Sequence, residues 1–331
     1  MSEQRREPQP QRSVTQQGGS PDGRGEVRMV PEEEVRNYYG RPVIKEPTWK
    51  WQIPWYFFTG GLAGASSGLA LVARLSGNDQ LARRAHLGVL VGAAASPPLL
   101  IWDLGRPERF YEMLRVFKPT SPMSVGTWVL SAFGSTTVLA VAHDLLGLFP
   151  RLGRISEALS ALLGLPLATY TAVLIADTSV PVWHEARREL PLIFAASSAA
   201  SAGAAAAILT PVGDAGPARR LVVGGALVEL GAVEAMKRRL GTFLAEPYGG
   251  GKAGRFDKLA KALSGLGAAV TAFGGRKRRS AAILGGALIL AGAACERWSI
   301  FEAGFQSARD PKYTVMPQRE RLRERDGASG G

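Results

Sequence analysis

The segment ILGGALILAGAAC, residues 283–295, contains no charged side chain and is apolar on every face of a helix. A surface helix of a soluble protein carries apolar residues on one face only. Other windows of similar composition recur between residues 54 and 300, and each has roughly the twenty residues needed to cross a hydrocarbon core of ~30 Å. The pattern predicts an all-α, polytopic membrane protein.

Eight such segments predict a bundle of about eight transmembrane helices in two groups of four. They are 54–75, 82–102, 122–146, 157–176, 190–209, 218–236, 258–273 and 280–300. The seventh is short and weakly apolar, so seven crossings is the alternative. The fifth is rich in Ala and Ser, and small residues of this kind let helices pack closely inside a membrane bundle.

The polar segments define the domain organisation. Residues 1–37 are expected to form a disordered polar tail, 38–303 a transmembrane domain and 304–331 a charged C-terminal tail. With eight crossings both termini share one face, here called the first face, together with loops 103–121, 177–189 and 237–257. This face carries about twice as many Lys and Arg residues as the opposite face, so the positive-inside rule places it in the cytoplasm.

Composition excludes several classes of function. The net charge is +12, but Lys and Arg cluster between apolar segments rather than along one stripe, which argues against nucleic acid as a partner. The single cysteine, Cys295, excludes a disulfide framework, a Cys-ligated iron–sulfur cluster and a zinc ribbon within this chain. His86 and His143 were weighed as axial haem ligands, but both fall at helix ends. We therefore expect no haem or metal in this chain.

A dense patch of charge separates the second and third apolar segments, in LLIWDLGRPERFYEMLRVFKPTSPMSVG, residues 99–126. Just before it, Pro97 and Pro98 cannot donate backbone hydrogen bonds, which predicts an opened helix. Within a membrane, such an opening persists only where the helix faces protein or a wet cavity. The sequence therefore predicts a site near this turn.

The charged residues after the turn are expected to form a docking loop on the first face. We expect Arg106 to pair with Asp103 or to contact acidic groups of a partner protein. Glu108 and Arg109 of the same loop, and His184 of the loop after the fourth span, are predicted to dock that partner.

Polar side chains from separate spans are predicted to gather near the same face. Tyr56 and Thr59 lie in the first span and Tyr170 in the fourth, where polar groups inside the membrane need partners. Together with Asp103 and Arg106, they predict a pocket for an amphipathic redox lipid. A quinone fits this description, because its head needs hydrogen-bond donors and a proton source while its tail needs an apolar wall.

One acidic residue lies near the middle of the sixth span. A lone carboxylate such as Glu229 costs several kcal/mol in this position unless it is neutral or paired. It is interpreted either as a proton relay, together with Asp177 at the first face, or as a hydrogen-bonded structural carboxyl.

Three stretches resemble the NrfD/PsrC family, the membrane subunits of polysulfide reductases. They are residues 38–66, 96–128 and 169–203, and the run DLGRPERF within the second is the most specific. The resemblance implies an eight-helix quinone-interacting anchor without a prosthetic group of its own. It implies an iron–sulfur partner of ferredoxin type, often a molybdopterin oxidoreductase subunit as well, and menaquinone or ubiquinone as exchangeable substrate. The implied quinone residues are Tyr56, Thr59, Asp103, Arg106 and Tyr170.

The leading hypothesis is therefore a subunit of an oxidoreductase complex in the cell membrane, similar to the membrane subunits of polysulfide reductase or formate dehydrogenase. It would pass electrons between the iron–sulfur partner and quinone, and would not be catalytic on its own. The alternatives are a proton- or ion-translocating subunit and a purely structural anchor. Inverted repeats, the usual mark of a transporter, are not evident in the sequence.

Overall fold

The computed structural model describes residues 43–319, which contain helices and no strands. The predicted disordered tail, residues 1–37, lies outside the described residues, as does the last part of the predicted C-terminal tail, residues 320–331. α10 continues to Arg309, beyond the predicted domain boundary at residue 303.

Eight long helices make up most of the described chain, and each predicted span falls within one of them. They are α1 (Gln52–Leu75), α2 (Asp79–Asp103), α3 (Pro122–Leu146), α4 (Pro150–Ala176), α6 (Leu190–Leu209), α7 (Gly216–Leu244), α9 (Gly251–Phe273) and α10 (Arg279–Arg309). The shorter elements are the 3-10 helix η1 (Pro107–Leu114), α5 (Pro181–Glu185) and α8 (Glu246–Gly249).

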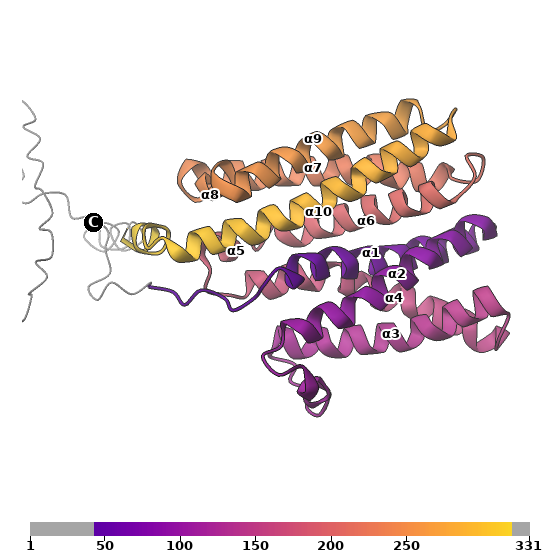
Figure 1. Ribbon diagram of the computed structural model, residues 1–331, viewed down its shortest axis with the longest axis horizontal. Helices are drawn as coiled ribbons and strands as arrows, with labels where there is room; N and C mark the ends of the chain where they lie inside the picture. Colours follow the sequence, from indigo (N-terminus) through magenta and orange to yellow (C-terminus); the bar gives the residue numbers. More distant parts are fainter. Residues whose placement is uncertain (1–42, 320–331) are drawn as a thin grey trace, which may run out of the picture. The chain divides into compact units, whose positions relative to one another are not determined.

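The all-α polytopic architecture predicted from the sequence is confirmed. Six of the described helices, α1 to α4, α6 and α10, are long and apolar enough to cross a membrane. α7 and α9 run alongside them in the same bundle (Figure 1) but have a higher proportion of charged residues. A count of eight crossings therefore stays a prediction.

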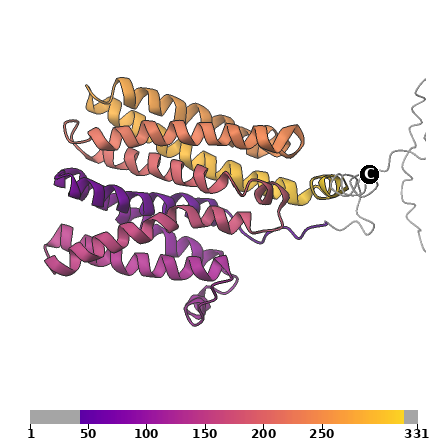
Figure 2. The ribbon, with the colours of Figure 1, turned by 180° about the vertical axis from the view of Figure 1, so that it is seen from behind.

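The long helices form the two predicted groups of four. α1 to α4 pack together in one group and α6, α7, α9 and α10 in the other, and α1 contacts both α6 and α10 across the boundary (Figures 1 and 2). The small residues of α6 do pack closely, as predicted: a Cβ on Gly225 of α7 would lie 2.7 Å from the backbone nitrogen of Ala200. Helices that pack at such short distances, as α6 and α7 do, have little freedom to slide along each other.

Each end of the bundle collects a defined set of connections. The α1–α2, α3–α4, α6–α7 and α9–α10 turns lie at one end, here called the second end (Figure 1). The first end carries the segment leading into α1, together with η1, α5, α8 and the end of α10. Arg309 pairs with Glu46 at 2.5 Å, so both ends of the described chain meet there.

Local sequence explains how the helices bordering the charged loop begin and end. The Ser121 hydroxyl accepts a hydrogen bond from the N–H of Ser124 at 3.4 Å and Pro122 occupies the first turn of α3, which ends at Gly147 in a left-handed conformation. The predicted opening at Pro97 and Pro98 is not seen, because α2 continues through both residues. They lie within its last two turns, so few helical hydrogen bonds follow them.

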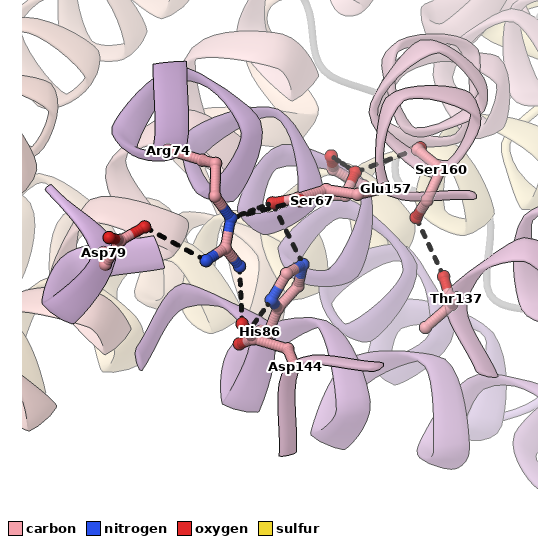
Figure 3. A network of polar contacts seen from close by, with 9 residues as sticks. Ser67, Arg74, Asp79, His86, Thr137, Asp144, Glu157 and Ser160 are labelled. Carbon is pink, nitrogen blue, oxygen red and sulfur yellow. Dashed lines mark hydrogen bonds and ion pairs between the residues drawn. The ribbon is translucent and has the colours of Figure 1, made fainter. Parts of the chain in front are cut away.

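A buried cluster of charges ties the first group together at the second end (Figure 3). Arg74 of α1 contacts Asp144 of α3 at 2.5 Å and Glu157 of α4 at 3.2 Å. His86 of α2 lies with Nδ1 2.9 Å from Asp144 and Nε2 3.7 Å from Glu157. The side chains of His86, Asp144 and Glu157 are at most 5% exposed. Both ring nitrogens of His86, considered above as a haem ligand, thus face carboxylates.

Replacing Asp144 with Asn should destabilise the first group strongly. The substitution leaves Arg74 and His86 without their shared carboxylate, and removing one partner of a buried ion pair costs about 3–5 kcal/mol. The matched control is Asp79→Asn, because Asp79 also contacts Arg74 at 3.2 Å but its side chain is 68% exposed. The control should cost less than about 1 kcal/mol. Unfolding in detergent, followed by tryptophan fluorescence, measures both, and equal effects would contradict a buried network.

Bulk at the crossing of α1 and α4 should also destabilise the bundle. A Cβ on Gly64 would overlap the carbonyl oxygen of Gly164, whereas Gly68, one turn further along α1, has open space around it. We expect Gly64→Val to lower stability by about 2 kcal/mol more than Gly68→Val, since overpacking strains the contact. Thermal unfolding of the two variants in the same detergent tests the difference, and a larger effect at Gly68 would refute the close crossing.

Candidate functional site

A cavity of about 440 Å³ lies within the first helix group, next to the charged turn that follows α2. Residues of α1, α2, η1, α3 and α4 line it, so the cavity collects side chains that are far apart in the sequence. Most of the wall is apolar, with residues such as Ile53, Phe57, Leu100, Leu130 and Leu174. η1 contributes Phe110, Met113 and Leu114 at the first end. The cavity suits a molecule with a long apolar part.

Two tyrosine hydroxyls meet in the wall of this cavity. Tyr56 of α1 and Tyr170 of α4 are hydrogen-bonded through their hydroxyl groups, and either one can be the donor. Their rings meet edge to face with centroids 6.4 Å apart. Gly126 of α3 makes room for this arrangement, since a Cβ at that position would overlap the Tyr170 ring. Because one hydroxyl donates to the other, the pair leaves one hydroxyl proton available to a polar group bound in the cavity.

Asp103, the last residue of α2, places a carboxylate in the same wall. Its Oδ1 accepts a hydrogen bond from the backbone N–H of Lys50 at 3.0 Å, which holds the segment before α1 against the end of α2. Within residues 43–319, no hydrogen bond involves its Oδ2. That oxygen is free to exchange a proton with a ligand or with solvent.

Two other predicted site residues do not line the cavity. The Thr59 hydroxyl lies 3.0 Å from the Ser96 hydroxyl of α2, so Thr59 supports the helix contact beside Tyr56. Arg106 caps the start of η1 and is exposed. In the described part of the chain it forms no ion pair with Asp103. The structure thus brings together Tyr56, Tyr170 and Asp103, and the assignment of all five to a quinone stays a prediction.

The predicted proton-relay residue Glu229 lies in the other helix group. It is buried on α7, within electrostatic range of Glu296 and Arg297 of α10. Arg297 is 3.2 Å from Glu296 and donates to the carbonyl oxygen of Phe194 at 3.0 Å. Glu229 therefore has charged neighbours, but it does not line the cavity that contains Tyr56 and Tyr170, called the tyrosine cavity below.

The remaining predicted residues lie at the first end. Asp177 and His184 are exposed and line a separate cavity of about 580 Å³ beside Tyr313. Burial raises the pKa of the Tyr313 hydroxyl, which therefore stays protonated. Glu108 and Arg109 are exposed on η1, and their role in docking a partner stays a prediction.

A row of hydroxyl groups on α3, not predicted from the sequence, also faces the cavity. Thr127, Ser131 and Ser135 all line the tyrosine cavity, and each donates to the carbonyl oxygen four residues earlier, at 2.8 to 2.9 Å. A spacing of four residues places side chains on one face of a helix. This spacing was visible in the sequence and would have identified α3 as the fourth wall of the cavity.

Among residues 43–319, no group of three or more His, Cys, Asp or Glu side chains is arranged to hold a metal ion.

The chain matches the family described as "Polysulphide reductase, NrfD" over residues 43–236. The matched range contains the whole tyrosine cavity and all of the first helix group. A comparison with curated proteins found no match. The chain therefore belongs to the polysulphide reductase NrfD family and is a multi-pass membrane protein of that family.

Proposed function

We propose that this chain is the quinone-interacting anchor of an oxidoreductase complex in the cell membrane. It passes electrons between an iron–sulfur partner of ferredoxin type and a membrane quinone. The tyrosine cavity carries the proposal, because two hydroxyl groups and one carboxylate meet an extended apolar wall there. Binding sites for amphipathic small molecules combine a few placed polar groups with an apolar lining in this way.

The chemistry assigned to the cavity is proton and hydrogen-bond supply. Reduction of a quinone to a quinol takes up two electrons, which the iron–sulfur partner provides, and two protons. One hydroxyl of the Tyr56–Tyr170 pair would donate a hydrogen bond to a quinone carbonyl oxygen while it accepts one from the other tyrosine. Asp103 would exchange protons with solvent at the first end. Oxidation of a quinol would use the same groups in reverse.

The iron–sulfur partner would dock at the first end, since electrons must arrive close to the cavity. η1 covers the cavity there and exposes Glu108 and Arg109, while His184 lies on α5, in the connection between α4 and α6 at the same end. The family membership also favours a molybdopterin oxidoreductase as a further subunit. The distribution of Lys and Arg supports a cytoplasmic location for this end and for both termini.

Proton translocation is a second candidate role, favoured by one observation. Glu229 is buried near Glu296 and Arg297, a set of ionisable groups that a purely passive anchor does not need. Proton uptake by vesicles during quinone turnover, compared between the wild type and Glu229→Gln, separates this role from simple anchoring.

Purification of the full chain from its native membrane in mild detergent tests the main proposal. We expect an iron–sulfur protein to copurify and quinone to be extracted in an amount comparable to that of the chain. Mass spectrometry identifies the first and chromatography of the organic extract the second. Absence of both would refute the anchor role.

Substituting Gly126 with Ala should weaken quinone binding. The new methyl group overlaps the Tyr170 ring and must displace it from Tyr56, so we expect a loss of roughly tenfold in affinity for a quinone analogue, equivalent to about 1.4 kcal/mol. Gly134→Ala is the matched control, because Gly134 lines the same cavity but has open space around it. Equal affinities in the two variants would remove Tyr170 from the site.

Substituting Arg106 with Ala should reduce copurification of the iron–sulfur partner severalfold, most visibly at low salt, where the attraction between this exposed arginine and acidic groups of the partner is screened least. The control is Arg151→Ala, which removes an equally exposed arginine at the second end. Partner recovery is measured by quantitative mass spectrometry. Full recovery with Arg106→Ala would show that this arginine does not contribute to docking.

A further inference from the structure

A cavity of about 490 Å³ opens at the second end, between the start of α7 and the end of α9. It lies in the second helix group, formed by α6, α7, α9 and α10, and at the opposite end of the bundle from the tyrosine cavity. Three arginines line it: Arg219 and Arg220 of α7, and Arg276 of the α9–α10 turn. Its wall also contains the apolar residues Val223 and Ala272.

The positive charge of this cavity is not compensated by carboxylates of the described residues, 43–319. In the part of the chain that the structure describes, none of the three guanidinium groups forms an ion pair with a carboxylate. Arg219 donates to the carbonyl oxygen of Val212 at 2.7 Å and lies within electrostatic range of Arg276 and Arg220. Arg74, in contrast, contacts three carboxylates at the same end. Like charges held together in this way favour binding of an anion.

Two of the three guanidinium groups, those of Arg219 and Arg220, lie close to the same point at the start of α7. The Nη2 atoms of Arg219 and Arg220 lie 4.0 and 3.9 Å from the place where a Cβ on Gly216 would be. Gly216 is the first residue of α7, and no side chain caps this helix. Two guanidinium groups therefore converge over the positive end of a helix, which adds to the attraction for an anion.

Apolar surface continues from the cavity toward the middle of the bundle. Leu227 follows Val223 by one turn of α7 toward the middle and is 63% exposed. Phe273, the last residue of α9 beside Ala272, is 82% exposed at the rim of the cavity. Within residues 43–319, both side chains are left largely uncovered. The cavity thus joins a cationic rim to a surface suited to hydrocarbon chains.

We propose that this cavity binds a phosphate group, supplied by the head of an anionic phospholipid whose acyl chains lie along α7 and α9. Guanidinium groups bind phosphate oxygens through paired hydrogen bonds, and basic pockets between membrane helices recognise anionic headgroups by this chemistry. The exposed apolar residues favour a lipid over free phosphate. The site is independent of the quinone proposal.

Lipid binding by the full chain, delipidated in mild detergent, tests the site. The unfolding temperature is followed by tryptophan fluorescence while phosphatidylglycerol, phosphatidylcholine or inorganic phosphate is added. We expect phosphatidylglycerol alone to raise it. In the triple variant Arg219→Gln, Arg220→Gln, Arg276→Gln, the phosphatidylglycerol concentration for a half-maximal shift should rise at least about tenfold.

The matched control removes three charges at the same end that do not line the cavity: Lys277→Gln, Arg278→Gln, Arg151→Gln. It should respond like the wild type. An unchanged response of the cavity variant, or an equal loss in the control, would overturn the site in favour of diffuse surface charge. A shift with inorganic phosphate equal to that with phosphatidylglycerol would overturn the lipid assignment.

Single substitutions keep the test decisive if the triple variant fails to fold. Arg220 and Arg276 are exposed and, within residues 43–319, have no ion-pair or hydrogen-bond partner to lose. Native mass spectrometry of Arg220→Gln and Arg276→Gln counts phospholipid that stays bound. Retention equal to that of the wild type in both variants would refute the proposal.

Discussion

The structure depends on one constraint: a polar group inside the hydrocarbon must find its partner within the protein, because no water is available there. The first helix group meets this constraint through cross-helix contacts. Arg74, Asp144 and Glu157 join three helices at the second end, and Thr137 of α3 and Ser160 of α4 share a hydrogen bond of 3.0 Å. These contacts fix the order and register of α1 to α4, and the tyrosine pair follows from that register.

Close packing through small residues supplies the complementary constraint. Gly64 and Gly164 bring the backbones of α1 and α4 into contact, so the tyrosines carried by the same two helices meet at their hydroxyl groups. Gly126 of α3 has no side chain, and the Tyr170 ring occupies the space that a Cβ would fill. A cavity remains because the neighbouring α3 positions carry short hydroxyl side chains that satisfy themselves within their own helix. The cavity is thus a consequence of residue size along three helices.

Much of this arrangement was predictable from the sequence, because it depends on local pattern. Apolar segments predicted every long helix, and the unusual polar residues Tyr56, Tyr170 and Asp103 share one cavity. Pairings between distant residues were not predictable. Arg74 and Asp144 are far apart in the chain, and Asp103 contacts the backbone of Lys50 instead of the predicted Arg106. Which residues pair depends on how each helix is rotated about its axis and on the path of each loop, and composition specifies neither.

Charge compensation distinguishes groups that hold the fold together from groups that remain available to ligands. Arg74 and His86 both have carboxylate partners inside the bundle. At Asp103, one carboxylate oxygen has no hydrogen bond within residues 43–319, and at Arg220 the guanidinium has no partner there. Each of these groups therefore keeps hydrogen-bonding capacity beside a cavity. The two ligand proposals rest on that capacity: a quinone in the tyrosine cavity near the first end, and a phospholipid phosphate at the second end.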